Sequence, residues 1–279
     1  MIEFRCAELV LNLARSSLTQ RLMLANDTTE RKAADDAGQP LANYWSQSRR
    51  PLTSLFLAAP LLLAYELGLI FLDRNDVANG AEALLNWFLR LLGFSIYFLL
   101  PGLTVAILLA WHHLLRQPWR VSHRVLAIMV VECGLWAVGL WLVWQLQMIV
   151  VQTIQLDARP SVTASLGDLH SRLGKIAGYC GAGVYEELLF RLIFLSAVIA
   201  LLRWLHLSRR ESVIVGIGLA SVVFSAAHYI GPWALPFDLA TFIFRCIAGA
   251  YFALLFRYRG FGIAAGAHAG YDVLVGMLR

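Results

Sequence analysis

Charged residues are scarce in this sequence, and the motifs of soluble cofactor-binding enzymes are missing. Asp, Glu, Lys and Arg make up only 15% of its 279 residues, whereas they make up about 25% of a soluble domain. Gly-rich phosphate loops, dinucleotide-binding fingerprints and the HExxH zinc motif are all absent. Hydrophobic residues reach 59%, and the mean hydropathy is +0.66. This composition excludes an ordinary soluble domain and predicts a polytopic membrane protein.

Cysteine is equally scarce, and its spacing excludes two further classes of protein. The four cysteines, Cys6, Cys133, Cys180 and Cys246, lie far apart, with neither CxxC nor a Cys/His metal spacing. This distribution supports neither a disulfide framework nor a zinc knuckle. The net charge is +5, but the basic residues form short clusters between apolar runs. Such clusters are typical of membrane topology rather than of a phosphate-binding surface, so no nucleic-acid partner is expected.

The N-terminal segment does not have the pattern of a signal peptide. Residues 1–50 lack a short apolar core followed by a small-residue cleavage site, and they carry charges of both signs. We expect a cytoplasmic tail, with an amphipathic helix near residues 7–24 and a flexible stretch through residues 27–39.

Long apolar runs fill the rest of the chain. A helix needs about 20 apolar residues to cross the hydrocarbon core of a bilayer. The stretches that meet this requirement are residues 52–72, 93–111, 125–149, 173–202, 212–230, 239–256 and 261–278. The fourth is longer than one straight crossing requires, so it must tilt, break near its glycines or protrude. The predicted fold is therefore an all-α, polytopic transmembrane helical bundle with about seven membrane spans.

Clusters of arginine predict the orientation of these spans. They precede the first span and follow the second, fourth and sixth, at Arg49 and Arg50, at Arg116, Arg120 and Arg124, at Arg203, Arg209 and Arg210, and at Arg257 and Arg259. The alternate loops, residues 73–80, 152–172 and 230–238, carry acids or balanced charge. Because positive loops stay in the cytoplasm, we expect the N-terminus inside and the C-terminus outside.

A few ionisable residues lie inside the predicted spans, where each costs a few kcal/mol even on lenient scales. They are Glu66, Glu132, Glu186, Glu187, Arg191, His228, Arg245, His268 and Asp272. Glu66 and Glu132 stand alone in their spans and are interpreted as packing ties or water-facing positions. Arg245 either snorkels to the interface or neutralises a buried acid.

The stretch GVYEELLFRL, residues 183–192, separates two adjacent glutamates by helical geometry. Glu187 and Arg191 are four residues apart and lie on one helix face, in the order that favours an ion pair. Glu186 is turned from Glu187 by about 100° and has no local partner. The alternative is a purely structural arrangement in which Arg245 neutralises Glu186.

Only two of the seven histidines, His228 and His268, lie inside apolar spans. The others are next to loops and are expected to be solvated: His112, His113, His123, His170 and His206. Phe224 lies one helical turn before His228 and is positioned to pack on its ring. Asp272 lies one turn after His268, within reach of an imidazole N–H. Together with Glu186, these residues predict a site.

The last predicted span has a second face made of glycine. Gly262, Gly266 and Gly270 recur every four residues, the small-xxx-small pattern that lets helices approach closely. On a helical wheel this stripe is centred about 140° from His268 and Asp272. We therefore expect one face to dock on neighbouring helices and the other to present the polar pair to a cavity.

A carboxylate and two histidines in a dry cavity are suited to activating water. Glu186 can act as general base, and an imidazole can share the water or stabilise an oxyanion. No Ser or Cys forms a nucleophile motif with either histidine, so covalent catalysis is weakly supported. With Asp272 as a fourth oxygen ligand, Glu186, His228 and His268 would also make an acceptable zinc set.

Three short motifs carry a resemblance to a known family. They are EELLFR (186–191), FSAAH (224–228) and HAGYD (268–272), in this order along the second half of the chain. They resemble the EExxxR, FxxxH and HxxxN/D motifs of the CPBP family of intramembrane proteases, which includes type II CAAX prenyl endopeptidases and bacteriocin-processing proteases. The resemblance covers roughly residues 172–279, and the tail and the front three spans carry none of its motifs. We therefore expect a cytoplasmic N-terminal tail (1–50), front transmembrane helices (51–151) and a CPBP-like catalytic core (152–279).

This resemblance implies roles for the site residues. Glu186 and His228 would activate water. His268 and Asp272 would hold the oxyanion or orient the site. The family often has Asn at the last position, where an amide donates a hydrogen bond, whereas an ionised Asp272 only accepts. Asp272 must then be protonated, orient His268 or bind metal.

The remaining motif residues have supporting roles by the same resemblance: Glu187, Arg191 and Phe224. No cofactor is certain, because the family has been described both as metallo and as glutamate-type. A divalent metal such as zinc would be held by the four residues named for water activation and oxyanion binding.

The resemblance also implies a substrate and a location. The substrate would be a membrane-anchored or lipidated, CAAX-like protein, cleaved near or within the bilayer, and the location would be the inner (plasma) membrane of a bacterium.

Two other functions fit the same charged residues. One is a proton-coupled carrier or channel, although no inverted repeat relates the two halves. The other is a catalytically inactive scaffold.

Overall fold

The computed structural model describes residues 40–72, 77, 80–91, 99–153, 169–230 and 234–278. In these residues all regular secondary structure is helical, which confirms the predicted all-α class. The chain forms two compact units, Met1–Ser46 and Gln47–Arg279, and the account below concerns the second. The amphipathic helix expected near residues 7–24 and the stretch at 27–39 lie outside the described residues.

Five helices of this unit are long and apolar enough to cross a membrane, so the chain is an integral membrane protein. They are α3 (Pro51–Phe71), α7 (His123–Thr153), α10 (Arg209–Ala227), α11 (Leu239–Arg259) and α12 (Phe261–Leu278). Two further helices are α5 (Gly80–Leu91) and the shorter apolar α6 (Leu99–Leu114). Helix α6 corresponds to the second predicted span, whose first residues are outside the described part. The count of seven spans and the orientation of the termini stay predictions.

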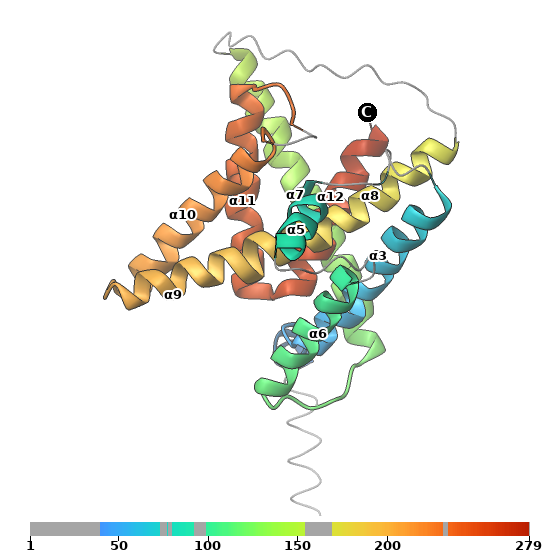
Figure 1. Cartoon of the computed structure of the whole chain (residues 1–279), viewed down its shortest axis with the longest axis vertical. Coiled ribbons are helices and arrows are strands. Elements are labelled where there is room, and N and C mark those ends of the chain that lie inside the picture. Colours follow the sequence, from blue (N-terminus) through green and yellow to red (C-terminus); the bar gives the residue numbers. More distant parts are fainter. Residues whose placement is uncertain are drawn as a thin grey trace, which may run out of the picture. The chain divides into compact units, whose positions relative to one another are not determined.

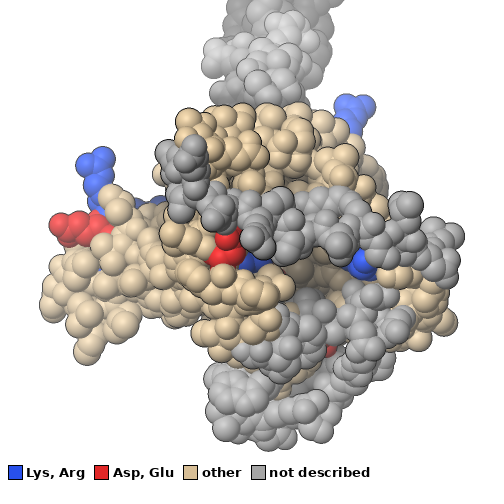
Figure 2. Space-filling view, turned by 90° about the horizontal axis from the view of Figure 1, so that it is seen from above, with Lys and Arg blue, Asp and Glu red and all other residues tan. Residues whose placement is uncertain are grey.

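The exposed side chains of these helices are largely apolar. On α7 the most exposed large residues are Val131, Leu135 and Leu146, each more than 60% exposed. Figure 2 shows a face of the molecule on which few of the described residues are charged. An apolar outer surface of this kind is what contact with lipid requires.

The fourth predicted span is one unbroken helical run of three parts. It starts as α8 (Leu169–Glu187), becomes the π-helix η1 (Leu188–Leu195) and ends as α9 (Ser196–Trp204). Figure 1 shows this run as the long yellow-to-orange helix that passes obliquely behind the labels of α8 and α9. The helix does not break at its glycines. Its hydrogen-bond pattern changes directly after Glu187, and such π segments are frequent at functional sites.

Helix α12 lies at the centre of the packing, against α3, α7, α8 and α11. Its glycine stripe makes the close contacts that the spacing predicts. A Cβ on Gly262 would lie 2.8 Å from Ser54 Cα of α3, and one on Gly266 would lie 2.6 Å from Cys133 Sγ of α7. The glycine face therefore docks on neighbouring helices, as expected.

A different glycine brings α8 onto α12. A Cβ on Gly183 would lie 2.7 Å from both the Cβ and the backbone nitrogen of Ala269. Because this approach tolerates no side chain, α8 and α12 meet almost backbone to backbone at this level. Glu186 and Glu187 follow Gly183 by one turn, which sets them beside His268.

Glu66 and Glu132, the two glutamates predicted to stand alone in their spans, both have partners. Tyr185 donates a hydrogen bond from its hydroxyl to Glu66 Oε1 at 3.0 Å. Arg259 donates to Glu132 from Nε at 2.5 Å and from Nη2 at 2.6 Å. Both glutamates are therefore ties between helices. Arg259 was expected in a cytoplasmic loop, but it ends α11 and is 2% exposed, because the ion pair with Glu132 draws it into the bundle.

One histidine differs from its prediction. His113, His123, His170 and His206 are exposed, as expected for loops. His112 is instead fully buried, with its ring edge-on to Trp119 at 4.7 Å between centroids. It lies in the last turn of α6, where the chain after the helix folds back and covers it.

Candidate active site

Glu187 and Arg191 form the predicted ion pair at the junction of α8 and η1. Arg191 Nη1 lies 3.1 Å from Glu187 Oε1, and both side chains are almost completely buried. The guanidinium also donates from Nη2 to the Gly249 carbonyl at 3.4 Å and lies over the Phe224 ring, 4.3 Å from its centroid. This arrangement ties the α8–η1 junction to α10 and α11.

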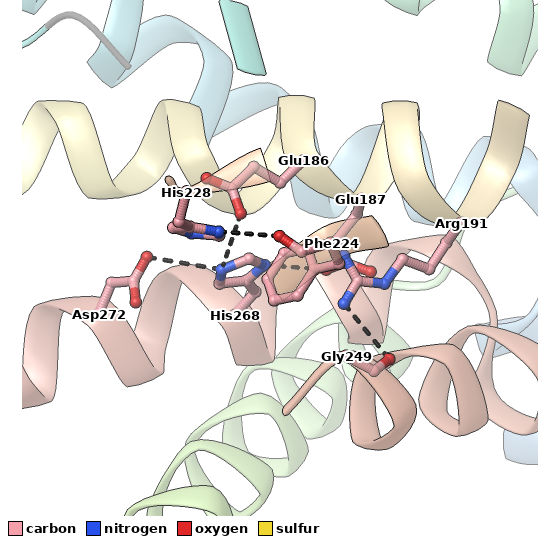
Figure 3. A network of polar contacts seen from close by, with 8 residues as sticks. All are labelled: Glu186, Glu187, Arg191, Phe224, His228, Gly249, His268 and Asp272. Atoms are coloured by element: carbon pink, nitrogen blue, oxygen red, sulfur yellow. Dashed lines mark hydrogen bonds and ion pairs between the residues drawn. The ribbon is translucent and has the colours of Figure 1, made fainter. Parts of the chain in front are cut away.

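Glu187 has a second partner that sequence reasoning did not assign to it. His268 on α12 lies with Nδ1 2.8 Å from Glu187 Oε1 (Figure 3). Because a carboxylate only accepts, Nδ1 carries the proton and donates it to Glu187. The ring of His268 is also stacked on Phe252, at 4.4 Å between centroids and 14° between planes. Glu187 and Phe252 therefore fix the orientation of the imidazole.

The other nitrogen of His268 faces two carboxyl groups. Nε2 lies 3.7 Å from Glu186 Oε2 and 3.6 Å from Asp272 Oδ2. The predicted proximity of His268 and Asp272 is confirmed, but both distances exceed that of a direct hydrogen bond. Asp272 therefore does not orient the ring by a direct hydrogen bond, since Glu187 holds the opposite nitrogen. Gaps of this size suit a bridging water.

His228 directly follows the end of α10 and is held by its own helix. Its Nδ1 lies 2.9 Å from the Phe224 carbonyl oxygen, and its ring packs edge-on against the Phe224 ring at 5.1 Å. The predicted packing is thus confirmed. Because the carbonyl accepts, Nδ1 carries the proton, and Nε2 of the neutral ring is an acceptor.

The residues converge on a cavity of about 210 Å³. Its polar lining comes from α8, the end of α10, α11 and α12, and it includes Glu186, His228, Thr241, Arg245, His268, Tyr271 and Asp272. Glu187 and Arg191 lie behind this lining and hold His268. The structure therefore brings all four residues predicted for the chemistry to one cavity wall.

Two aspects of the cavity were missed by sequence reasoning. Arg245 was interpreted as snorkelling or neutralising an acid, yet its side chain lines the cavity. Part of the cavity wall is apolar and is formed by three aromatic residues of α7 and α11, which are Trp144, Phe244 and Phe252. The helical spacing of Arg245, Ala248 and Phe252 is the signal that could have placed them on one face.

The structural alternative required Arg245 to neutralise Glu186. Within the described residues no ion pair joins them, and the carboxylate contact of Glu186 is with His268 instead. Glu186 Oε2 is buried and accepts no hydrogen bond in the described part of the chain. The geometry therefore does not support a closed, fully neutralised cluster.

The metal alternative also requires converging ligands. Among the described residues, no group of three or more His, Cys, Asp or Glu side chains is arranged to hold a metal ion. As they are placed in the structure, Glu186, His228, His268 and Asp272 do not form such a ligand group. His268 uses Nδ1 for Glu187 and His228 uses Nδ1 for a backbone carbonyl, so Nε2 of each ring is the nitrogen that faces the cavity chemistry.

Comparison with known proteins confirms the resemblance carried by the three motifs. Residues 171–274 match a family model described as Rce1-like, type II CAAX prenyl endopeptidase. The match runs from α8 into α12 and includes all three motifs. No curated protein and no solved structure gave a significant match.

Proposed function

We propose that this integral membrane protein is an intramembrane endopeptidase, because residues 171–274 match the family model described as Rce1-like, type II CAAX prenyl endopeptidase. It hydrolyses a peptide bond by means of water activated by Glu186 and His228. The observation that carries this proposal is the convergence of two oriented histidines and Glu186, whose Oε2 accepts no hydrogen bond among the described residues, on one cavity.

The substrate is a membrane-anchored or lipidated, CAAX-like protein. Support comes from the position of the cavity among apolar helices and from its aromatic wall, which suit an apolar chain better than a soluble peptide. The bilayer is therefore both the solvent of the enzyme and the phase that delivers the substrate. The inner (plasma) membrane of a bacterium is the proposed location.

Water is activated by two acceptors. Glu186 Oε2 has no hydrogen-bond donor of its own in the described residues, and the neutral His228 ring offers Nε2. A water held between them gives a proton to Glu186 as its oxygen attacks the scissile carbonyl carbon. The C–N bond then breaks, and Glu186 returns the proton to the amine that leaves. Atoms and protons balance, and Glu186 ends as it began.

His268 stabilises the oxyanion formed in the attack. Its Nδ1 donates to Glu187, so Nε2 can donate only when the ring is an imidazolium. The neighbouring carboxyl groups of Glu186, Glu187 and Asp272, all within 4 Å of a ring nitrogen, balance that positive charge. Asp272 completes the site by facing Nε2, and Glu187, Arg191 and Phe224 support it from behind.

The test compares Glu186→Gln with Glu66→Gln in purified protein. Glu66 is a matched control, since it is also a glutamate within a span but binds Tyr185 away from the cavity. On a prenylated CAAX-like peptide, Glu186→Gln should lose about 10²- to 10⁴-fold in kcat/KM, as expected for a general base. Glu66→Gln should stay close to wild type.

Equal cleavage by wild type and Glu186→Gln would remove Glu186 from the mechanism. A chelator arm addresses the metal alternative in the same assay. We expect cleavage to be insensitive to chelator, and loss of activity that zinc restores would replace the glutamate mechanism with a metal one.

A further inference from the structure

Tyr185 lies on α8 directly before Glu186 and is completely buried. Successive residues of an α-helix are turned by about 100° from one another, so Tyr185 and Glu187 flank Glu186 on its two sides. On one side, Glu187 contacts His268 at 2.8 Å. On the other side, the Tyr185 hydroxyl donates to Glu66 Oε1 of α3 at 3.0 Å. Helix α8 is therefore tied to other helices on both sides of the residue that faces the cavity.

The Tyr185 contact is made between two closely packed helices. Tyr65 of α3 is also completely buried, and its ring lies edge-on to that of Tyr185 at 5.4 Å between centroids. A Cβ on Gly181, one turn before Tyr185, would lie 2.2 Å from Tyr65 Cδ2. A Cβ on Gly68 of α3 would lie 2.5 Å from Ala177 Cβ of α8. This packing sets the distance between the helices, and the hydrogen bond adds a directional contact that fixes their rotation.

The position of Glu66 in α3 is not explained by packing alone. Helix α3 is long and apolar enough to span a membrane, where an ionisable side chain is costly. Glu66 does not line the cavity, and it lies outside the residues that match the family model. Apolar side chains of similar volume often stabilise a buried contact as well as a polar pair does. The direction that a hydrogen bond imposes is the better explanation for the pair of Tyr185 and Glu66.

The position of the Glu186 carboxylate is sensitive to rotation of α8. Side chains reach about 5–6 Å from the axis of a helix, so a rotation of about 10° moves their ends by roughly 1 Å. A misplacement of about 1 Å at an active site can cost about 100-fold in rate. Glu186 Oε2 lies 3.7 Å from His268 Nε2, a gap that suits a bridging water. A further ångström would take the two groups out of reach of one water.

We propose that Tyr185, through its hydrogen bond to Glu66, is a positioning residue that fixes the rotation of α8 so that Glu186 faces the cavity. This inference rests on the proposed endopeptidase function and extends it to the front part of the chain, where the family model finds no match. Tyr185 acts through Glu186 and does not touch the substrate.

The first test measures kcat and KM separately for Tyr185→Phe with the prenylated CAAX-like peptide. This substitution keeps the ring and removes only the hydroxyl. We expect kcat to fall roughly 10- to 100-fold, because the general base is displaced. KM should change less than about twofold, because the cavity wall that binds the peptide is intact. A rise in KM with unchanged kcat would contradict a positioning role.

The second test changes the acceptor of the same hydrogen bond. Glu66→Leu removes the acceptor and should lower kcat as much as Tyr185→Phe. Glu66→Gln keeps a side-chain oxygen that accepts from Tyr185, so its kcat should stay near that of wild type. The double variant Tyr185→Phe/Glu66→Leu should lose no more than either single variant. A larger loss in the double variant would show that the two residues act independently.

Tyr65→Phe is the matched control. It removes a hydroxyl from the neighbouring buried ring, one that donates to Glu82 Oε2 of α5 at 2.5 Å, and leaves the Tyr185–Glu66 bond in place. We expect it to lower the denaturation midpoint in detergent, as Tyr185→Phe does, while kcat is kept. An equal loss of kcat in the two variants would mean that any loosening of α3 against α8 slows the reaction, and the positioning role would be wrong.

A chemical label at residue 186 reports its orientation without any substrate. In Glu186→Cys a small, water-soluble thiol reagent should modify the new cysteine, since this position lines the cavity. Wild type gives the background from the native cysteines. Adding Tyr185→Phe should slow the modification, because the side chain turns away from the cavity, whereas adding Tyr65→Phe should not. Unchanged labelling with Tyr185→Phe would overturn the inference.

The outcomes separate this inference from the function on which it rests. If wild type cleaves the peptide and Tyr185→Phe does so with the same kcat, the positioning role is wrong while the endopeptidase stands. If wild type does not cleave the peptide, the proposed function fails. The labelling experiment then decides by itself whether Tyr185 sets the orientation of residue 186.

Discussion

Two arginine–glutamate contacts buried among the described helices of this protein differ in how completely the charges are paired. Between α7 and α11, Arg259 donates from two nitrogens to the two oxygens of Glu132, at 2.5 and 2.6 Å. At the α8–η1 junction, Arg191 makes a single contact of 3.1 Å with Glu187. The same Glu187 oxygen also accepts from His268.

The difference extends to the surroundings. In the Glu132 contact an acid meets a base, and neither Glu132 nor Arg259 lines the cavity. Around His268 there are three carboxyl groups, those of Glu186, Glu187 and Asp272, and two of them face a cavity. A buried charge within a span therefore does not by itself indicate a site. Several carboxyl groups gathered around one histidine beside a cavity do.

The largest expected effect comes from removing the charge of Glu187, the acid in the contact at the α8–η1 junction. Glu187→Gln leaves Arg191 buried without its counter-charge and replaces the charged acceptor of His268 with a neutral amide oxygen. We expect a loss of about 3–5 kcal/mol in the free energy of unfolding, the range for breaking a buried pair. The kcat/KM of the folded fraction should also fall at least about tenfold, because the imidazolium of His268 loses the negative charge beside it.

Denaturation in detergent measures the first effect, and cleavage of the prenylated peptide per folded enzyme measures the second. A Glu187→Gln protein as stable and as active as wild type would show that the contact with Arg191 and His268 has no role.

A smaller effect, on the free energy of unfolding alone, is expected at the contact between Glu132 and Arg259. Glu132→Gln breaks the pair with Arg259, but the Glu132 carboxylate keeps 15% exposure, so water compensates in part. We expect a loss of about 2–3 kcal/mol in the free energy of unfolding. Cleavage per folded enzyme should stay near wild type. If this variant loses activity while its folding is retained, the division between a structural and a functional charge cluster is wrong.

The smallest effect is expected at Asp272. Asp272→Asn keeps an oxygen facing His268 Nε2 and adds an N–H donor of the kind that the resembling family often has at this position. We expect kcat/KM to change by less than about tenfold, with folding unchanged. Asp272→Ala removes both groups and should cost more. A loss in Asp272→Asn as large as that in Glu186→Gln would show that the carboxylate itself takes part in the chemistry.

The contacts predicted from the sequence were those between residues one or two helical turns apart. Glu187 with Arg191, and Phe224 with His228, follow from the helical repeat once each segment is known to be a helix. The docking face of α12 follows in the same way from the spacing of Gly262, Gly266 and Gly270. The partner of Arg259 could not be found by this reasoning, because Glu132 is 127 residues away.

The sequence by itself determined that the chain is an apolar helical bundle and which few polar positions it tolerates, because run length and local spacing suffice for both. Only the tertiary structure decided how those positions combine. The close approach of α8 and α12 at Gly183 gives His268 to Glu187, 81 residues away, and leaves Glu186 facing the cavity. Helix packing sets such contacts through backbone distance and side-chain direction, which a one-dimensional pattern does not contain.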